Sequence, residues 1–178
     1  MSSVASPTVV LLNGPAGVGK TTIGRELAAS ARNGVCIHGD DLKSFIVARD
    51  LDSVRTGLTY VGCAALADVF IDAGYDLVVV DFIFSCRRDV RRLVDALTSS
   101  PRVLLFTLWA PLATVIAREA TRVGRPPLGD RVTGCWNELS TNRDELGTVI
   151  DALAAPDEIV RLLIARAETT EAEVPRED

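Results

Sequence analysis

A chain of 178 residues has the length of one domain, and a hydrophobic content of 48% is enough to build a core. The net charge of −5 argues against a nucleic-acid binder, which would carry a basic stripe. The four cysteines form no C-x-x-C pair, so we expect free thiols and a reducing, cytoplasmic location. We see no signal peptide and no apolar stretch long enough for a bilayer, and therefore expect no membrane partner.

Apolar runs predict five strands, at residues 9–12, 35–38, 77–81, 103–108 and 148–150, and helical patterns lie between them, at residues 21–32, 42–49, 54–73, 87–97, 111–122, 133–145 and 156–167. Such alternation indicates an α/β fold in three layers, with a parallel sheet covered on both faces. Ligands of such folds collect at the carboxyl ends of the strands. We expect one domain over residues 1–167 and an acidic, disordered tail over residues 168–178.

The first strand runs into a segment that fits the pattern G-x-x-x-x-G-K-[ST] without a mismatch, and a helix follows it. Glycines there let successive N–H groups point at a phosphate, and the helix start adds positive charge. Lys20 can reach the β- and γ-phosphates, and Thr21 can ligate Mg²⁺. The sequence therefore predicts ATP and Mg²⁺ as cofactors, bound by Gly14, Pro15, Ala16, Gly17, Val18, Gly19, Lys20, Thr21 and Thr22.

Two aspartates follow the second strand, in the order His38-Gly39-Asp40-Asp41-Leu42. A carboxylate at this place would face the space beyond the γ-phosphate and could take the proton of a substrate hydroxyl. We assign that role to Asp40 ahead of Asp41, with helix N-capping as the alternative for either residue. We interpret His38 as a packed residue at a strand end.

The third strand ends in Asp81 after four apolar residues, which is the Walker B form. Its carboxylate would hold Mg²⁺ together with Thr21. The alternative is a structural cap at the end of a buried strand.

Arginines gather between residues 118 and 131, where a helix gives way to a segment rich in glycine and proline. We interpret this segment as a lid over the nucleotide, with Arg118 and Arg122 binding ATP. Arg122 and Arg125 would neutralise charge on the transferring phosphoryl group. A solvated helix face is the alternative. Residues 151–156, after the last strand, would pack against the adenine ring.

The sequence defines the acceptor pocket less clearly than the nucleotide site. We expect Asp40, Asp41, Arg55 and Phe84 to contact the acceptor. An apolar wall would suit an antibiotic-like molecule, and a basic one would suit an acidic sugar or a metabolite phosphate. The aromatic side chains could equally belong to the core, and the arginines to the surface. The aromatic candidates are Phe45, Tyr60, Phe82, Phe84 and Trp136, and the basic ones are Arg55, Arg87 and Arg88.

The order of phosphate loop, strand ending in Gly39-Asp40 and arginine-bearing lid resembles the small-molecule P-loop kinases of the nucleoside-monophosphate-kinase type. Shikimate and gluconate kinases, chloramphenicol phosphotransferase and the zeta-toxin kinases belong to this group. The chain is most similar to chloramphenicol phosphotransferase, and 125–128 looks like the lid motif of shikimate kinase. The shared segments are Asp40-Asp41-Leu42, Arg118-Glu119-Ala120-Thr121-Arg122 and Gly129-Asp130-Arg131-Val132.

The resemblance implies the strand order 2-3-1-4-5, and it implies that Asp40 is the base that activates the substrate hydroxyl. The chain departs from chloramphenicol phosphotransferase at Asp81-Phe82, where that enzyme has two acids, and in a longer lid. We therefore expect an ATP-dependent phosphotransferase acting on an alcohol group of a small molecule, such as an antibiotic or other secondary metabolite.

Two other functions remain open at this stage. The first is a nucleotide switch or regulatory ATPase, although the chain has no Asn-Lys-x-Asp motif and no Leu-Ser-Gly-Gly signature. The second is a toxin-type kinase of a nucleotide sugar. The expected partner is a small hydroxyl-bearing acceptor, and homo-oligomerisation is left open.

Overall fold

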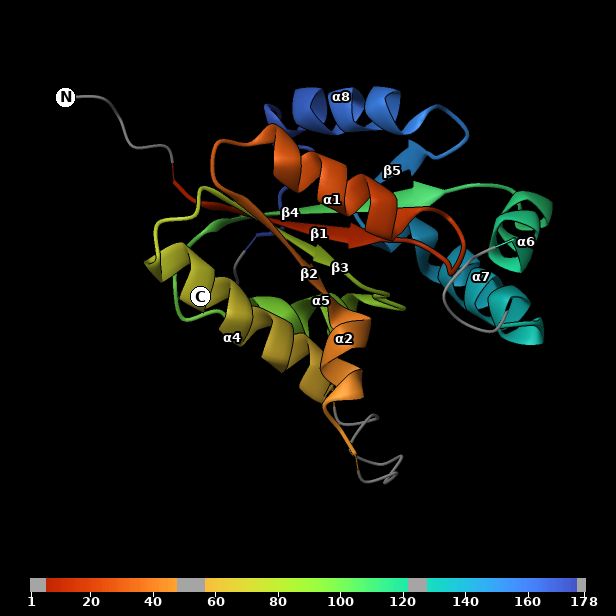
Figure 1. Ribbon diagram of the computed structural model, residues 1–178, viewed down its shortest axis with the longest axis horizontal. Helices are drawn as coiled ribbons and strands as arrows, with labels where there is room; N and C mark the ends of the chain where they lie inside the picture. The colour runs from red at the N-terminus through yellow and green to blue at the C-terminus, as the bar shows by residue number, and fades with distance from the viewer. Residues whose placement is uncertain (1–5, 48–56, 122–127, 176–178) are drawn as a thin grey trace.

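The computed structural model describes residues 6–47, 57–121 and 128–175 of the chain. Its centre is a five-stranded parallel sheet in the order β2-β3-β1-β4-β5 (Figure 1), which confirms the predicted order. The strands are β1 (Thr8–Asn13), β2 (Gly34–His38), β3 (Leu77–Asp81), β4 (Arg102–Trp109) and β5 (Thr148–Asp151).

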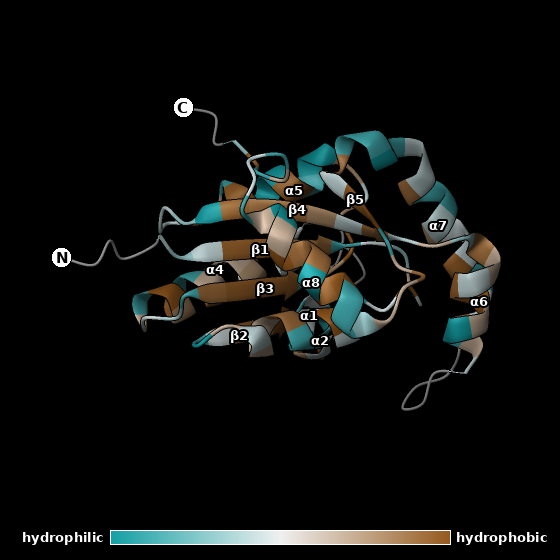
Figure 2. Ribbon diagram, turned by 90° about the horizontal axis from the view of Figure 1, so that it is seen from above, coloured by the Kyte–Doolittle hydropathy of each residue, from teal (hydrophilic) through white to brown (hydrophobic). Residues whose placement is uncertain are grey.

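Alternate side chains of the strands pack into two separate hydrophobic cores, one on each face of the sheet. Val10, Leu12 and Phe106 pack on one face beneath α1 (Lys20–Ser30) and α8 (Pro156–Ala167). Val9 and Leu11 pack on the other face against α4 (Leu58–Asp72) and α5 (Arg87–Val94). Successive side chains of a strand point to opposite faces of the sheet, and here both faces are covered by helices. The strands are therefore apolar over most of their length (Figure 2). The predicted three-layer α/β fold is confirmed.

The remaining helices surround the carboxyl edge of the sheet. They are α2 (Gly39–Ser44), α6 (Leu112–Ala120) and α7 (Asp130–Asn142), the last continued by the short 3₁₀ helix η1 (Arg143–Glu145). Helix α2 begins three residues earlier than predicted, directly after β2, and its first turn contains both aspartates. None of the helices in the described ranges is long and apolar enough to cross a membrane.

The prediction of a disordered tail is wrong for residues 168–175. The Leu105 N–H donates to the Ala172 carbonyl at 2.8 Å, and the Val174 N–H donates to the Val103 carbonyl at 2.9 Å. These bonds add an antiparallel segment to the part of β4 that β5 leaves uncovered. The acidic composition concealed this pairing, because backbone groups and the buried Ala172 make it.

A buried carboxylate joins α4 to the segment before β4. Asp68 accepts hydrogen bonds from the backbone N–H groups of Thr98 and Ser99, at 2.8 and 3.0 Å, and from both hydroxyls. Burial acts to raise the pKa of Asp68, but the hydrogen bonds from Ser99 and Thr98 outweigh it and lower the pKa below its usual value. Asp68 is therefore a structural acceptor on the face away from α1.

Candidate active site

The strand register brings three polar residues, His38, Asp81 and Asn13, to the carboxyl edge of the sheet. His38 on β2 pairs with Asp81 on β3, and Asn13 follows Leu12, which pairs with Asp81 from β1. The fully buried Asn13 donates to the Thr107 hydroxyl at 3.1 Å and accepts from the Phe84 N–H at 2.9 Å. These bonds fix the chain where β1 leaves the sheet and the glycine-rich loop begins.

The loop from Gly14 to Thr21 depends on glycine at specific positions. Gly14 and Gly17 have φ values of +141° and +83°. A Cβ at either position would lie 2.5 Å from a backbone oxygen, that of Leu108 for Gly14 and that of Val115 for Gly17. A side chain is therefore excluded both by conformation and by the close approach of the chain. Gly19, the N-cap of α1, offers no side chain to cap the helix, so the helix start suits an anion.

The motif's two functional side chains lie together at the start of α1. Lys20 Nζ donates to the carbonyls of Gly14 and Pro15, at 2.7 and 3.1 Å, which holds the ammonium over the loop. The Thr21 hydroxyl donates to Asp81 Oδ2 at 2.8 Å, although the two residues are 60 positions apart. A threonine hydroxyl beside a carboxylate is the oxygen donor set that Mg²⁺ prefers. The residues present therefore fit a nucleotide phosphate and its magnesium ion.

Sequence reasoning missed two residues at this site, His38 and Arg25. His38 Nδ1 lies 2.9 Å from Asp81 Oδ2, and Arg25 Nε donates to His38 Nε2 at 3.1 Å. The interpretation of His38 as only a packed strand-end residue is therefore incomplete. The signal lay in the spacing, because Arg25 follows Thr21 by four residues, about one helical turn, and therefore lies on the same side of α1.

The two candidate bases lie in the first turn of α2, next to the end of β2. Neither is the N-cap, which is His38, so the capping alternative is wrong for both. The Asp40 side chain is 80% exposed and its Oδ1 is 2.9 Å from Lys43 Nζ. Lys43 also lies 4.5 Å over the ring of Phe82, which limits its freedom. Asp40 is thus a solvent-accessible carboxylate with a cation beside it.

Arg118 connects the phosphate loop to the loop after β5. Its Nη1 donates to the Val18 carbonyl at 3.2 Å and to the Ala152 carbonyl at 2.9 Å. A hollow of about 450 Å³ lies beside the same loop, at the ends of β4 and β5. It is lined by Trp109, Ala110, Pro111, Val149, Asp151 and Leu153. Arg118 and this loop are therefore neighbours of the phosphate loop, in the region where the sequence predicts the adenine.

The structure corrects one predicted contact. Phe84 is fully buried, with its ring 5.5 Å from that of Tyr60 and 6.3 Å from that of Phe82. It belongs to the core, so the prediction that it contacts an acceptor is wrong. Phe45, by contrast, is 76% exposed just after α2. The predicted Arg55, Arg122 and Arg125 lie outside the described residues.

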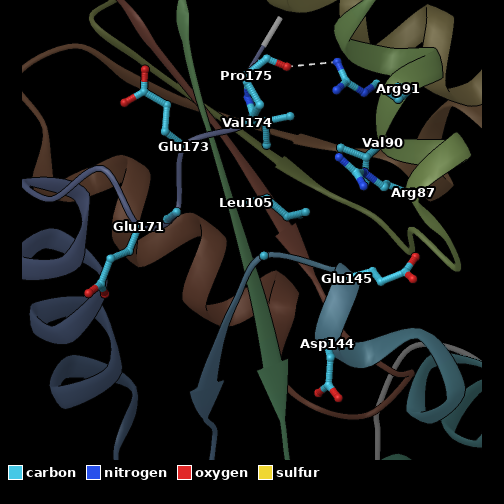
Figure 3. Close-up of a pocket in the computed structure, with 12 residues that line it drawn as sticks. Arg87, Val90, Arg91, Leu105, Asp144, Glu145, Glu171, Glu173, Val174 and Pro175 are labelled. Carbon is cyan, nitrogen blue, oxygen red and sulfur yellow. Dashed lines mark hydrogen bonds between the residues drawn. The ribbon is translucent and has the colours of Figure 1, made fainter. Parts of the chain in front are cut away.

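A second cavity, of about 340 Å³, lies away from this edge, between the C-terminal segment, α5 and η1 (Figure 3). Arg91 Nη1 donates to the Pro175 carbonyl across it at 2.9 Å. Its lining mixes both signs of charge, since it includes Arg87 and Arg91 as well as Glu145 and Glu173. The phosphate loop contributes nothing to this cavity.

The fold and site together define a P-loop protein with the fold of small-molecule kinases. A gluconokinase from Sinorhizobium meliloti is 19% identical, with a TM-score of 0.66 over 90% of this chain and 91% of that one. A shikimate kinase from Aquifex aeolicus is 13% identical, with a TM-score of 0.64 over 90% of this chain and 96% of that one. A tunicamycin resistance protein from Deinococcus radiodurans is 26% identical, with a TM-score of 0.65 over 96% and 99%.

The family model of an AAA domain matches residues 9–134, and the chain belongs to this family. No curated protein matches the chain. The expected resemblance to P-loop kinases is confirmed at the level of the fold.

Proposed function

We propose that the protein is an ATP-dependent kinase that transfers the γ-phosphoryl group to a hydroxyl of a small molecule. One observation carries the proposal: the phosphate loop, the Thr21–Asp81 pair and the exposed carboxylate of Asp40 follow adjacent strands at one edge of the sheet. A switch ATPase needs the first two features. The exposed acid at the start of α2 favours a kinase, because phosphoryl transfer to an alcohol requires a proton acceptor.

Each residue has a role in this mechanism. The loop N–H groups and Lys20 bind and orient the phosphates, and Lys20 stabilises charge as it develops on the β/γ bridge. Thr21 and Asp81 would hold Mg²⁺, which would neutralise negative charge on the phosphates. Asp40 orients the acceptor hydroxyl and accepts its proton while the oxygen attacks in line. Arg122 and Arg125 stabilise the transferring group; this assignment rests on the sequence.

The base would bind near the loop after β5. Arg118 already touches that loop, and Leu153, which lines the hollow there, is 53% exposed. An apolar, partly open surface of this kind suits a planar base.

For the acceptor we propose an antibiotic or another secondary metabolite. The match covers 99% of the tunicamycin resistance protein, which has the highest sequence identity of the three neighbours described. The exposed Phe45, close to Asp40 in the chain, would offer an apolar contact. An acidic sugar, as for the gluconokinase, is the alternative acceptor, and a nucleotide sugar is a third.

An acceptor panel tests the proposal. Gluconate, shikimate, chloramphenicol, tunicamycin and a nucleotide sugar are each incubated with the protein, ATP and Mg²⁺, and mass spectrometry detects the gain of one phosphoryl group. The Lys20→Ala variant is the control for contaminating kinases. Phosphorylation of one acceptor by the wild type alone supports the proposal. ATP hydrolysis without transfer to any acceptor, abolished in the same variant, would favour the regulatory ATPase.

A homo-oligomer would form through the outer face of α4. Leu58, Val61, Leu66 and Val69 point to solvent there and leave 37–61% of their surface exposed. Between Leu58 and Val69 the helix carries one charged residue, the buried Asp68. A helix with apolar residues on its outer face normally has it covered. We propose this face as the contact between two copies of the chain.

A further inference from the structure

We propose that His38 is a positioning residue for the magnesium-binding carboxylate: its Nδ1–H holds Asp81, and Arg25 holds the ring at Nε2. The inference rests on the proposed function, because it assigns a role at the same site. It concerns two residues that the phosphate-loop pattern does not contain.

The position of His38 follows from the sheet. It is the last residue of β2 and pairs in register with Asp81, the last residue of β3. Both side chains are largely buried, with 13% of His38 and 6% of Asp81 exposed. The distance of 2.9 Å between Nδ1 and Oδ2 is that of a good hydrogen bond. Few competing waters can reach a contact this enclosed, so the ring is well placed to hold the carboxylate.

The direction of that hydrogen bond follows from Asp81, because an ionised carboxylate can only accept, and Arg25 on the other side of the ring agrees with it. A guanidinium can only donate, so His38 Nε2 must accept at 3.1 Å through its lone pair. The proton of the neutral ring then lies on Nδ1 and is donated to Asp81. Arg25 lies on α1, one turn after Thr21, and it therefore couples the helix that carries the phosphate loop to the end of β2.

The consequence falls on Asp81 and Thr21. Asp81 Oδ2 receives two donors, His38 Nδ1 at 2.9 Å and the Thr21 hydroxyl at 2.8 Å. These two bonds fix the carboxylate, and they leave the lone pairs of the Thr21 oxygen to face away from Asp81. Partners that orient a metal-binding carboxylate typically change metal affinity by about 10- to 100-fold when removed.

The ring itself gives the first test, because His38 is the one histidine of the chain. Its ¹⁵N and ¹H resonances therefore need no assignment against other histidines. We expect the neutral Nδ1–H tautomer in the wild type at pH 8, and in Arg25→Leu as well, because Asp81 still accepts from Nδ1. The Nε2–H tautomer in the wild type would overturn the proposal, and so would its appearance in Arg25→Leu, since Asp81 would then not be accepting from the ring.

The second test separates positioning from packing. His38→Asn keeps a donor at the place of Nδ1, and His38→Leu keeps volume without a donor. ADP binding is followed by calorimetry while Mg²⁺ is varied, with ADP binding in EDTA as the reference. We expect the Mg²⁺ concentration for half of the metal-dependent effect to rise by about 10- to 100-fold in His38→Leu. His38→Asn should stay within a few-fold of the wild type, and binding in EDTA should not change.

The outcomes are distinct. Equal Mg²⁺ dependence in His38→Leu and the wild type would overturn the positioning role, and so would an equal loss in both His38 variants. Should His38→Leu fail to fold, His38→Gln replaces it, because its amide group lies near the place of Nε2 and leaves no donor at that of Nδ1. A wild type that binds no ADP would overturn the proposed function and with it the role toward magnesium. The tautomer would still be decided by the NMR measurement.

Discussion

Replacing Asp40 by asparagine should abolish most phosphoryl transfer and leave the fold intact. The side chain is 80% exposed in the first turn of α2, and it forms an ion pair with Lys43. A surface ion pair of this kind contributes at most about 1 kcal/mol to stability. Loss of a general base slows transfer by about 10²- to 10⁴-fold, equivalent to about 3–5 kcal/mol of transition-state stabilisation. The effect on the rate should therefore greatly exceed the effect on stability.

The assay measures kcat, KM for ATP and thermal melting for Asp40→Asn, with Asp41→Asn as the matched control on the next residue. We expect a normal melting curve, a KM for ATP within a few-fold of the wild type and a strongly reduced kcat in Asp40→Asn alone. Lys43→Met should change the rate much less, because it keeps the carboxylate. A fully active Asp40→Asn with an inactive Asp41→Asn would refute the assignment of the base.

Three further predictions address other parts of the molecule. Lys20→Ala should lower kcat by at least about 10²-fold with little change in melting, since the ammonium donates to carbonyls of its own loop rather than packing in a core. Substantial turnover would contradict the loop assignment. Asp68→Ala should destabilise the fold by about 2–3 kcal/mol at pH 7 in denaturant titrations. Folding lowers the pKa of Asp68, so its contribution to the free energy of unfolding is present above the unfolded-state pKa near 3.8 and is lost as the pH falls through the folded value. The stability difference between Asp68→Ala and the wild type should therefore shrink in acid. A difference that stays constant with pH would refute this. Val69→Glu on α4 should convert a dimer into a monomer in sedimentation experiments, whereas Ile164→Glu on α8, which is also exposed, should not; a wild type that sediments as a monomer would exclude the α4 contact.

Much of the fold could be predicted from the sequence because its signals are local. The apolar runs of the strands and the glycine pattern at residues 14–21 depend on near neighbours, and all five strands were found within about one residue of their ends. The order of strands came from the resemblance rather than from the pattern.

The errors share a different cause, since each depends on contacts between distant segments. Phe84 follows a strand end and could have faced an acceptor, but the chain turns it into the core through the Asn13 hydrogen bond. The acidic charge of the tail predicts disorder, although its backbone pairs with β4. His38 acquires its role only because the register places it opposite Asp81 and α1 brings Arg25 beside it.

The central claim, transfer of the γ-phosphoryl group to a small molecule, is tested most directly by the fate of labelled ATP. The protein is incubated with Mg²⁺, ATP labelled in the γ-phosphoryl group and the acceptor that gains mass in the panel. We predict that the label appears on the acceptor in proportion to the ADP formed, and that Asp40→Asn suppresses both. Label found only in inorganic phosphate, with or without acceptor, would contradict the assignment as a kinase.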